Sequence, residues 1–125
     1  MIVFSPDYTP MPDLATLESA LGSVFPDADL RIPNVAGTGI GPHINVTPAT
    51  DPPFSVNAYD NGSISTDGTL EQAAIVAALI RSLLPDGQRV IAVTPDGTRF
   101  VELTPGISSD DVANGWRDIA DLNLD

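Results

Sequence analysis

The stretch that decides the fold is residues 69–84, TLEQAAIVAALIRSLL, in which all but a few positions are apolar. Thr69, followed three places later by Gln72, has the spacing of a helix capping box. Pro85 and Gly87 end the helix that this pattern predicts. A helix that is apolar on nearly every side has to be covered on more than one side. The run is too short and too rich in alanine for a membrane span, so the rest of the chain is predicted to cover it.

The flanking segments predict two further helices and a set of strands. Apolar residues spaced for one helical face follow Asp13, a good N-cap, and stop at Pro26. Short segments in which apolar and polar residues alternate predict half-buried strands. The predicted order is a helix at 14–25, strands at 44–46, 54–58 and 63–66, the helix at 69–84, strands at 89–94 and 98–103, and a helix at 109–121. Short strands near Ile2, at a sheet edge, and near Leu30 are left open.

The turn at Asp60, Asn61 and Gly62 predicts a hairpin with a defined register. A type I turn with Gly62 in the left-handed bulge position sets Ile64 beside Ala58, on the buried face of the sheet. A two-residue turn would instead place Ile64 on the opposite face. We therefore expect the bulged turn.

The turn at residues 95–97, Pro-Asp-Gly, predicts a second hairpin of the same bulged type. That register pairs Thr94 with Thr98 and Ile91 with Val101. It divides the apolar residues into one face with Ile91, Val93, Val101 and Leu103 and another with Val90, Ala92 and Phe100. A strand pair that is apolar on both faces has to be covered twice.

Phe100 and Trp116 are the large side chains for which the predicted packing around the central helix offers no clear buried position. One interpretation is that part of this face is left open for a partner or for self-association. It makes Val90, Ala92, Phe100 and Trp116 the candidate partner-binding residues. The alternative is that the helix at 109–121 folds onto this face and buries both aromatic side chains.

The charge balance narrows the class of partner. Seventeen acidic residues against five arginines give a net charge of −12, divided evenly between residues 1–62 and 63–125. Such a charge disfavours nucleic acid and anionic lipid, and it favours a basic protein partner. A bias of the genome or a saline cytoplasm would explain the same composition, and the sequence does not decide between these origins.

Motifs for chemistry are sparse. The chain has no Cys and a single His, His43, at the start of a predicted strand. The glycine run at 37–41 is followed by Pro42 and a strand, whereas a phosphate cradle needs a helix N-terminus there. We therefore expect no catalytic residue, no metal site and no cofactor. A ligand of the 37–41 loop is left open.

The element order from Asp13 to Leu122, together with small size and strong acidity, resembles the class I chaperones of type III secretion systems. The resemblance is one of topology, and it implies a small acidic dimer that holds an effector segment against an apolar surface of sheet and helix. Small acidic immunity proteins, which neutralise secreted toxins, have a similar profile.

The sequence thus predicts one α+β domain over residues 1–125, with an antiparallel sheet of about five strands against a central helix and two flanking helices. The expected function is that of a non-enzymatic, cytoplasmic protein-binding module of the chaperone or immunity type with a basic partner. A homodimer is left open. The N-terminus has no basic, apolar pattern of a signal peptide. The alternative function is a small hydrolase or ligand-binding protein that uses His43 and nearby Asp residues.

Overall fold

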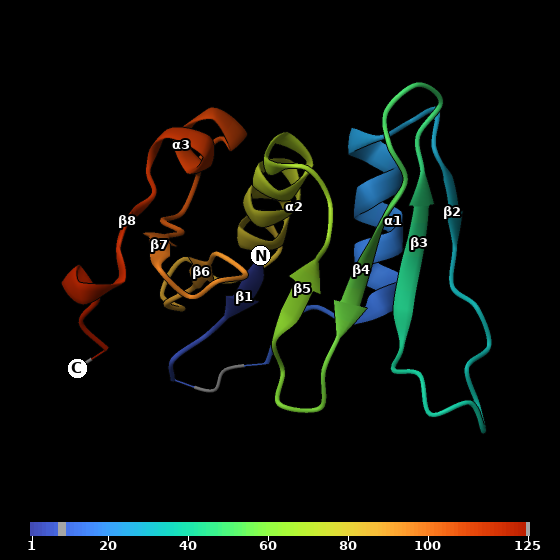
Figure 1. Cartoon of the computed structure of the whole chain (residues 1–125), viewed down its shortest axis with the longest axis horizontal. Coiled ribbons are helices and arrows are strands. Elements are labelled where there is room, and N and C mark those ends of the chain that lie inside the picture. The colour runs from blue at the N-terminus through green and yellow to red at the C-terminus, as the bar shows by residue number, and fades with distance from the viewer. Residues whose placement is uncertain (8–9, 125) are drawn as a thin grey trace.

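A computed structural model describes residues 1–7 and 10–124 of the chain, which form an α+β fold (Figure 1). Its sheet has eight strands, in the order β2-β3-β4-β5-β1-β6-β7-β8, and every pair of neighbours is antiparallel. The α+β class is confirmed, but the prediction of about five strands is too low. The elements are β1 (Ile2–Phe4), α1 (Leu14–Val24), β2 (Asp29–Arg31), β3 (His43–Thr47), β4 (Phe54–Ala58), β5 (Ile64–Thr66), α2 (Leu70–Ser82), β6 (Ile91–Val93), β7 (Arg99–Glu102), α3 (Ser109–Asn114), β8 (Arg117–Asp118) and a 3₁₀ turn, η1 (Ile119–Asp121).

Helix α2 begins with the predicted capping box. The Thr69 hydroxyl accepts a hydrogen bond from the backbone N–H of Gln72 at 3.2 Å, and the Gln72 side chain accepts one from the N–H of Thr69 at 2.9 Å. These reciprocal bonds satisfy backbone donors that the first helical turn leaves without partners. The start of the central helix is therefore set by local sequence.

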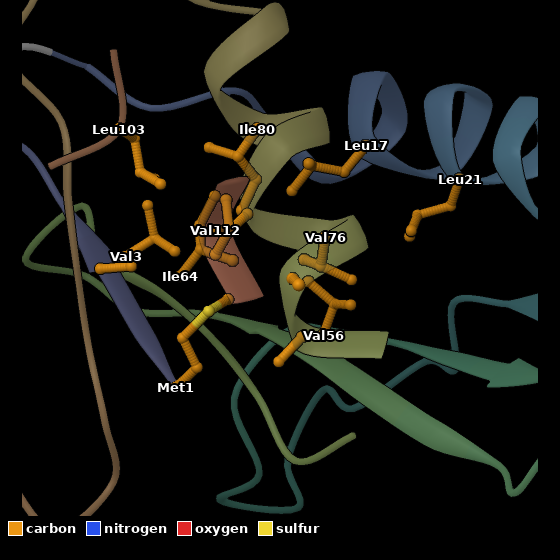
Figure 2. Packing of buried hydrophobic residues seen from close by; sticks show 14 of the residues in the cluster. Met1, Val3, Leu17, Leu21, Val56, Ile64, Val76, Ile80, Leu103 and Val112 are labelled. Carbon is orange, nitrogen blue, oxygen red and sulfur yellow. The ribbon is translucent and has the colours of Figure 1, made fainter. Parts of the chain in front are cut away.

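Helix α2 lies between α1 and α3, and the three helices share one hydrophobic core with one face of the sheet (Figures 1 and 2). Val76, Ala77 and Ile80 of α2 are fully buried. Figure 2 shows the side chains of α2 among core residues from the sheet and from α1. Burial of side chains such as Val76 and Ile80 contributes about 1.5–3 kcal/mol each. The need to cover α2 on several sides is met by the sheet and by both other helices.

Strand β1 is central, whereas the sequence suggested an edge strand. It pairs with β5 through Val3 and Ile64 and with β6 through Val3 and Ala92. Because the connection through α2 carries the chain from β5 to β6, two strand positions away, one position is left between them, and β1 fills it. The fully buried Val3 then joins the two halves of the sheet into one.

The first hairpin has the predicted register. Ala58 pairs with Ile64, the N–H of Tyr59 donates to the carbonyl of Ser63 at 3.0 Å, and Gly62 has a φ of +85°. This left-handed conformation favours glycine. Ile64 is consequently buried on the helix side of the sheet.

The second hairpin is one residue longer than predicted, and the predicted pairs are wrong. Val93 pairs with Phe100, and the N–H of Thr94 donates to the carbonyl of Arg99 rather than to that of Thr98. The extra residue is accommodated by side-chain acceptors. The Asp96 carboxylate accepts from the N–H of Thr98 at 3.1 Å, and the Thr94 hydroxyl accepts from the N–H of Arg99 at 3.1 Å.

This shift changes which residues share a face. Val90, Ala92, Val101 and Leu103 all belong to the core on the helix side. Ile91 and Phe100 are buried on the other side of the sheet. A one-residue slip moves a whole strand's side chains to the opposite face, so the predicted division of the apolar residues was wrong.

Helix α3 ends at Asn114 rather than extending to residue 121. Gly115 caps it, and a Cβ at Gly115 would lie 2.7 Å from the carbonyl oxygen of Asp111 and 3.2 Å from a methyl group of Val101. The chain then extends as β8 along the edge of β7, with Phe100 opposite Arg117. The predicted helical spacing of Trp116 and Ile119 was therefore coincidental.

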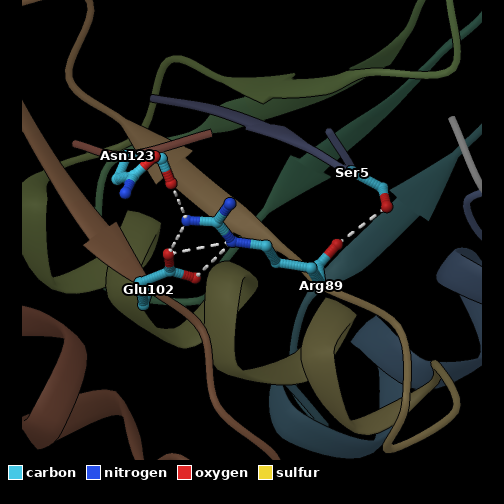
Figure 3. Close-up of polar contacts among 4 residues, drawn as sticks. All are labelled: Ser5, Arg89, Glu102 and Asn123. Carbon is cyan, nitrogen blue, oxygen red and sulfur yellow. Dashed lines mark hydrogen bonds and ion pairs between the residues drawn. The ribbon is translucent and has the colours of Figure 1, made fainter. Parts of the chain in front are cut away.

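Arg89 links three parts of the chain (Figure 3). Its guanidinium forms an ion pair with Glu102 and donates a hydrogen bond to the carbonyl of Asn123. Its own carbonyl accepts a hydrogen bond from the hydroxyl of Ser5 at 2.7 Å. The segment after η1 is thereby attached to β7 and to the end of β1.

No helix in the described residues has both the length and the apolar character needed to cross a membrane.

The Asp96 turn predicts a specific dependence of stability on pH. Hydrogen bonds from Thr94 and Thr98 lower the pKa of Asp96 from 3.8 to about 2. A lowered pKa stabilises the fold above the ordinary value, and this contribution is lost as the pH falls from about 4 to about 2. Asp96→Asn keeps an oxygen acceptor, the role that Asn61 fills in the first hairpin. We expect near wild-type stability at neutral pH and a smaller loss on acidification.

Urea unfolding of wild type and Asp96→Asn at neutral pH and at about pH 4 and pH 2 measures this difference. Asp60→Asn, in the other hairpin turn, is the matched control and should lose stability on acidification as the wild type does. If wild type and Asp96→Asn lost the same free energy of unfolding on acidification, the hydrogen-bonded Asp96 carboxylate would not be the source of this pH dependence.

Loss of the buried Arg81 guanidinium is expected to destabilise the fold. Its side chain is 2% exposed, and its guanidinium donates to the carbonyl oxygens of Leu84, Pro85 and Asp86 at 3.1–3.3 Å. Arg81→Leu leaves these carbonyls without their donor, so it should lower the free energy of unfolding by about 2–4 kcal/mol. Arg81→Lys keeps the positive charge but not the planar set of guanidinium donors, so its free energy of unfolding should lie between those of the wild type and Arg81→Leu. Urea unfolding of the three proteins gives the order, and wild-type stability of Arg81→Leu would refute this role.

Candidate functional site

A hollow lies between α2 and α3. It has a volume of about 230 Å³. The small side chains of Ala74 and Ala113 leave the space, and Ile75 and Trp116 border it. The full lining is Leu70, Glu71, Ala74, Ile75, Ser109, Asp110, Ala113 and Trp116. We call it the α2–α3 hollow.

A second hollow lies on the other side of the first turn of α2, with a volume of about 330 Å³. It is lined by Phe25, Asp51, Pro52, Thr69, Leu70, Glu71, Gln72 and Ile75. Its shape depends on Gln72, whose side-chain N–H₂ donates to the carbonyl of Pro52 at 2.8 Å. The residue that caps α2 thus also holds the β3–β4 connection against the helix. We call this space the α2–loop hollow.

Leu70 stands between the two hollows and is 75% exposed. It is the first residue of α2, directly after the Thr69 cap. At this position the helix has only begun, and the buried stripe of α2 starts at Gln72. Leu70 therefore offers a large apolar side chain to solvent at the start of α2, the end of this helix that is at the top in Figure 1.

The ionisable residues around this end are acidic. Glu71 lines both hollows, Asp110 lines the first and Asp51 lines the second. A smaller space of about 170 Å³ continues past Phe25 and Asp51 to Asp27. Within the described part of the chain, no arginine lines any of the three spaces. Glu71 and Asp110 also sit in first helical turns, where a negative charge favours the helix.

The candidate partner-binding residues do not form one surface. Val90 and Ala92 are fully buried on the helix side, and Phe100 is 1% exposed on the other side of the sheet. The guanidinium of Arg117 lies over the Phe100 ring, 5.4 Å from its centroid. Trp116 alone among these four is partly accessible, in the α2–α3 hollow.

Sequence reasoning counted Leu70 as part of the buried helix, and the structure places it at the surface. The available signal was its position, because the residue after an N-cap precedes the periodic stripe of the helix. Ala113 and Ala74 carried no signal, since a hollow between small side chains depends on how two helices pack.

His43 and the glycine loop lie away from this end. His43 begins β3, which then runs toward the connection that lines the α2–loop hollow. Its Nδ1 atom is 2.9 Å from the carbonyl oxygen of Gly41. Among the described residues, no group of three or more His, Asp or Glu side chains is placed to hold a metal ion. The hydrolase alternative stays a prediction.

A further hollow beside β1, of about 510 Å³, is lined by Ile2, Phe4, Ser5, Pro10 and the β4–β5 turn.

Comparisons with protein-family models, with curated proteins and with solved structures give no significant match to this chain.

Substitution of Leu70 tests whether its exposed side chain contributes to the stability of the fold. Because the side chain is 75% exposed, Leu70→Ser should change the free energy of unfolding by less than about 0.5 kcal/mol. Ile80→Ala, at a fully buried position of the same helix, should cost about 2–5 kcal/mol. Denaturant unfolding of both variants gives the comparison. A large loss of stability in Leu70→Ser would mean that this side chain is needed for folding.

Proposed function

We propose that this chain is a non-enzymatic protein-binding module that holds a basic segment of a partner protein where α2 begins and α3 packs beside it. The observation that carries the proposal is the exposed Leu70 between two hollows whose ionisable lining residues are acidic. Apolar contact would supply affinity, and the acidic surface would steer the partner and select its charge.

The size of the α2–α3 hollow supports a protein partner over a small molecule. Pockets for drug-sized ligands and cofactors usually measure about 300–1,000 Å³, whereas this hollow measures about 230 Å³ and the α2–loop hollow, at about 330 Å³, lies at the lower end of that range. The α2–α3 hollow suits one large apolar side chain. Single side chains that fill such pockets are the usual anchors of protein interfaces.

The net charge of −12 supports a basic partner. It acts against binding of nucleic acid or anionic lipid, whose phosphates are repelled by the same field. Two roles fit a small acidic binder of this kind: a chaperone that shields a segment of its client, and an immunity-type protein that neutralises a basic toxin. Both roles rest on the same contact.

The experiment is affinity purification with the tagged protein, followed by calorimetry with the partner purified on its own. We expect a partner whose cross-linked segment is rich in Lys and Arg. Its affinity should fall at least tenfold between about 0.05 M and about 0.5 M salt, because exposed charges are screened.

Matched variants separate local from overall charge. Glu71→Gln with Asp110→Asn, and Asp60→Asn with Asp86→Asn, each remove two negative charges. The first pair should weaken binding several-fold, and the second, which lines neither the α2–α3 hollow nor the α2–loop hollow, should leave it nearly unchanged. A partner with an acidic contact segment, or binding indifferent to salt and to the first pair, would refute the proposal. A measured turnover abolished by His43→Ala would replace it with the hydrolase alternative.

A further inference from the structure

We propose that the bound segment carries two apolar anchor residues, one in each hollow, with Lys or Arg beside them. This inference rests on the proposed function and specifies the partner's chemistry. Its basis is that Leu70, Glu71 and Ile75 line both hollows, so a segment that crosses the first turn of α2 contacts the two in succession.

The walls of each hollow define what enters it. In the α2–α3 hollow, Ile75 and Trp116 provide apolar walls and Ala113 lies at an exposed position. In the α2–loop hollow, Phe25 and Pro52 provide the apolar walls. Phe25 is held by an edge-to-face contact with Phe54, with ring centroids 5.5 Å apart. Each space therefore offers apolar walls to an anchor side chain, and the α2–loop hollow is also lined by the polar side chains of Asp51, Thr69 and Gln72.

The charged groups favour cations between and beside the anchors. Glu71 lines both spaces, Asp110 lines the α2–α3 hollow, and Asp51 lines the α2–loop hollow. A Lys or Arg next to either anchor would meet a carboxylate without displacing a protein cation, because no arginine lines the two hollows in the described residues. Such pairs contribute specificity and association rate.

Charge also decides against a second copy of this chain as the occupant. Each copy carries −12, and the surface around the hollows is acidic, so an identical molecule would bring like charge to the contact. A basic segment of another protein is the complementary occupant.

The test uses fluorescein-labelled decapeptides of Lys and Ser that contain two Leu separated by one, two, three or four residues. Matched peptides have one Leu replaced by Ser or every Lys replaced by Glu. Fluorescence anisotropy gives Kd, and in unlabelled peptides the emission of Trp116, the only Trp of the chain, reports occupancy of the α2–α3 hollow. We expect one spacing to bind best, at least tenfold tighter than its one-Leu counterpart, and the Glu peptide not to bind.

Filling variants assign the anchors. Ala113→Phe fills the α2–α3 hollow and Asp51→Phe the α2–loop hollow, with Asp51→Asn as the charge control. In each filling variant, the two-Leu peptide should lose its at least tenfold lower Kd relative to the one-Leu peptide. Ala15→Phe, at an exposed position on α1, should leave both Kd values unchanged. All three positions are exposed, and thermal unfolding verifies that the four variants fold.

Equal binding of two-Leu and one-Leu peptides, or wild-type binding by both filling variants, would overturn the two-anchor inference. Self-association of the wild type that Ala113→Phe abolishes would overturn it as well, by giving the hollow to a second copy. If a purified basic partner binds in a salt-dependent manner but tolerates both fillings, the inference fails and the proposed function stands. If no basic partner binds at all, both fail.

Discussion

The burial of α2 between the sheet, α1 and α3 is the constraint on which the rest of the structure depends. Val76, Ala77 and Ile80 are removed from water, and no single layer covers a helix that is apolar on so many sides. The cover of α2 by α1, by α3 and by one face of the sheet follows from it. The position of β1 is related to the crossover through α2, because the chain leaves β5, forms α2 and returns as β6 two positions away, with β1 between them.

The same helix has two ends with different roles. At its C-terminal end, the buried Arg81 side chain donates to the carbonyls of residues 84–86, so the chain turns tightly into β6. At its N-terminal end, Gln72 bonds both to the Thr69 cap and to the carbonyl of Pro52. This end keeps an exposed Leu70 and the two hollows, so the parts proposed for binding are held by the parts that stabilise the helix.

Local sequence predicted the features that local chemistry sets. The capping box at Thr69 and the bulged turn at Gly62 required only nearby residues, and both were predicted correctly. The register of the second hairpin was missed because the Thr94 and Asp96 side chains supply acceptors that lengthen the loop by one residue. The central position of β1 depends on pairing with strands far along the chain, which periodicity does not reveal. Of the residues that line the α2–α3 hollow, only Trp116 was a candidate from the sequence, because the hollow itself depends on the packing of α2 against α3.

Native-state hydrogen exchange across the whole chain tests the central role of α2 most directly. The account predicts that the amides of Val76, Ala77 and Ile80 exchange only through global unfolding, with opening free energies equal to the free energy of unfolding from denaturant titration. The amides of α3 should exchange through smaller openings. Exchange of the α2 amides by local opening, while the amides of β3 and β4 remain protected, would show that the sheet is stable without the helix and would contradict the account.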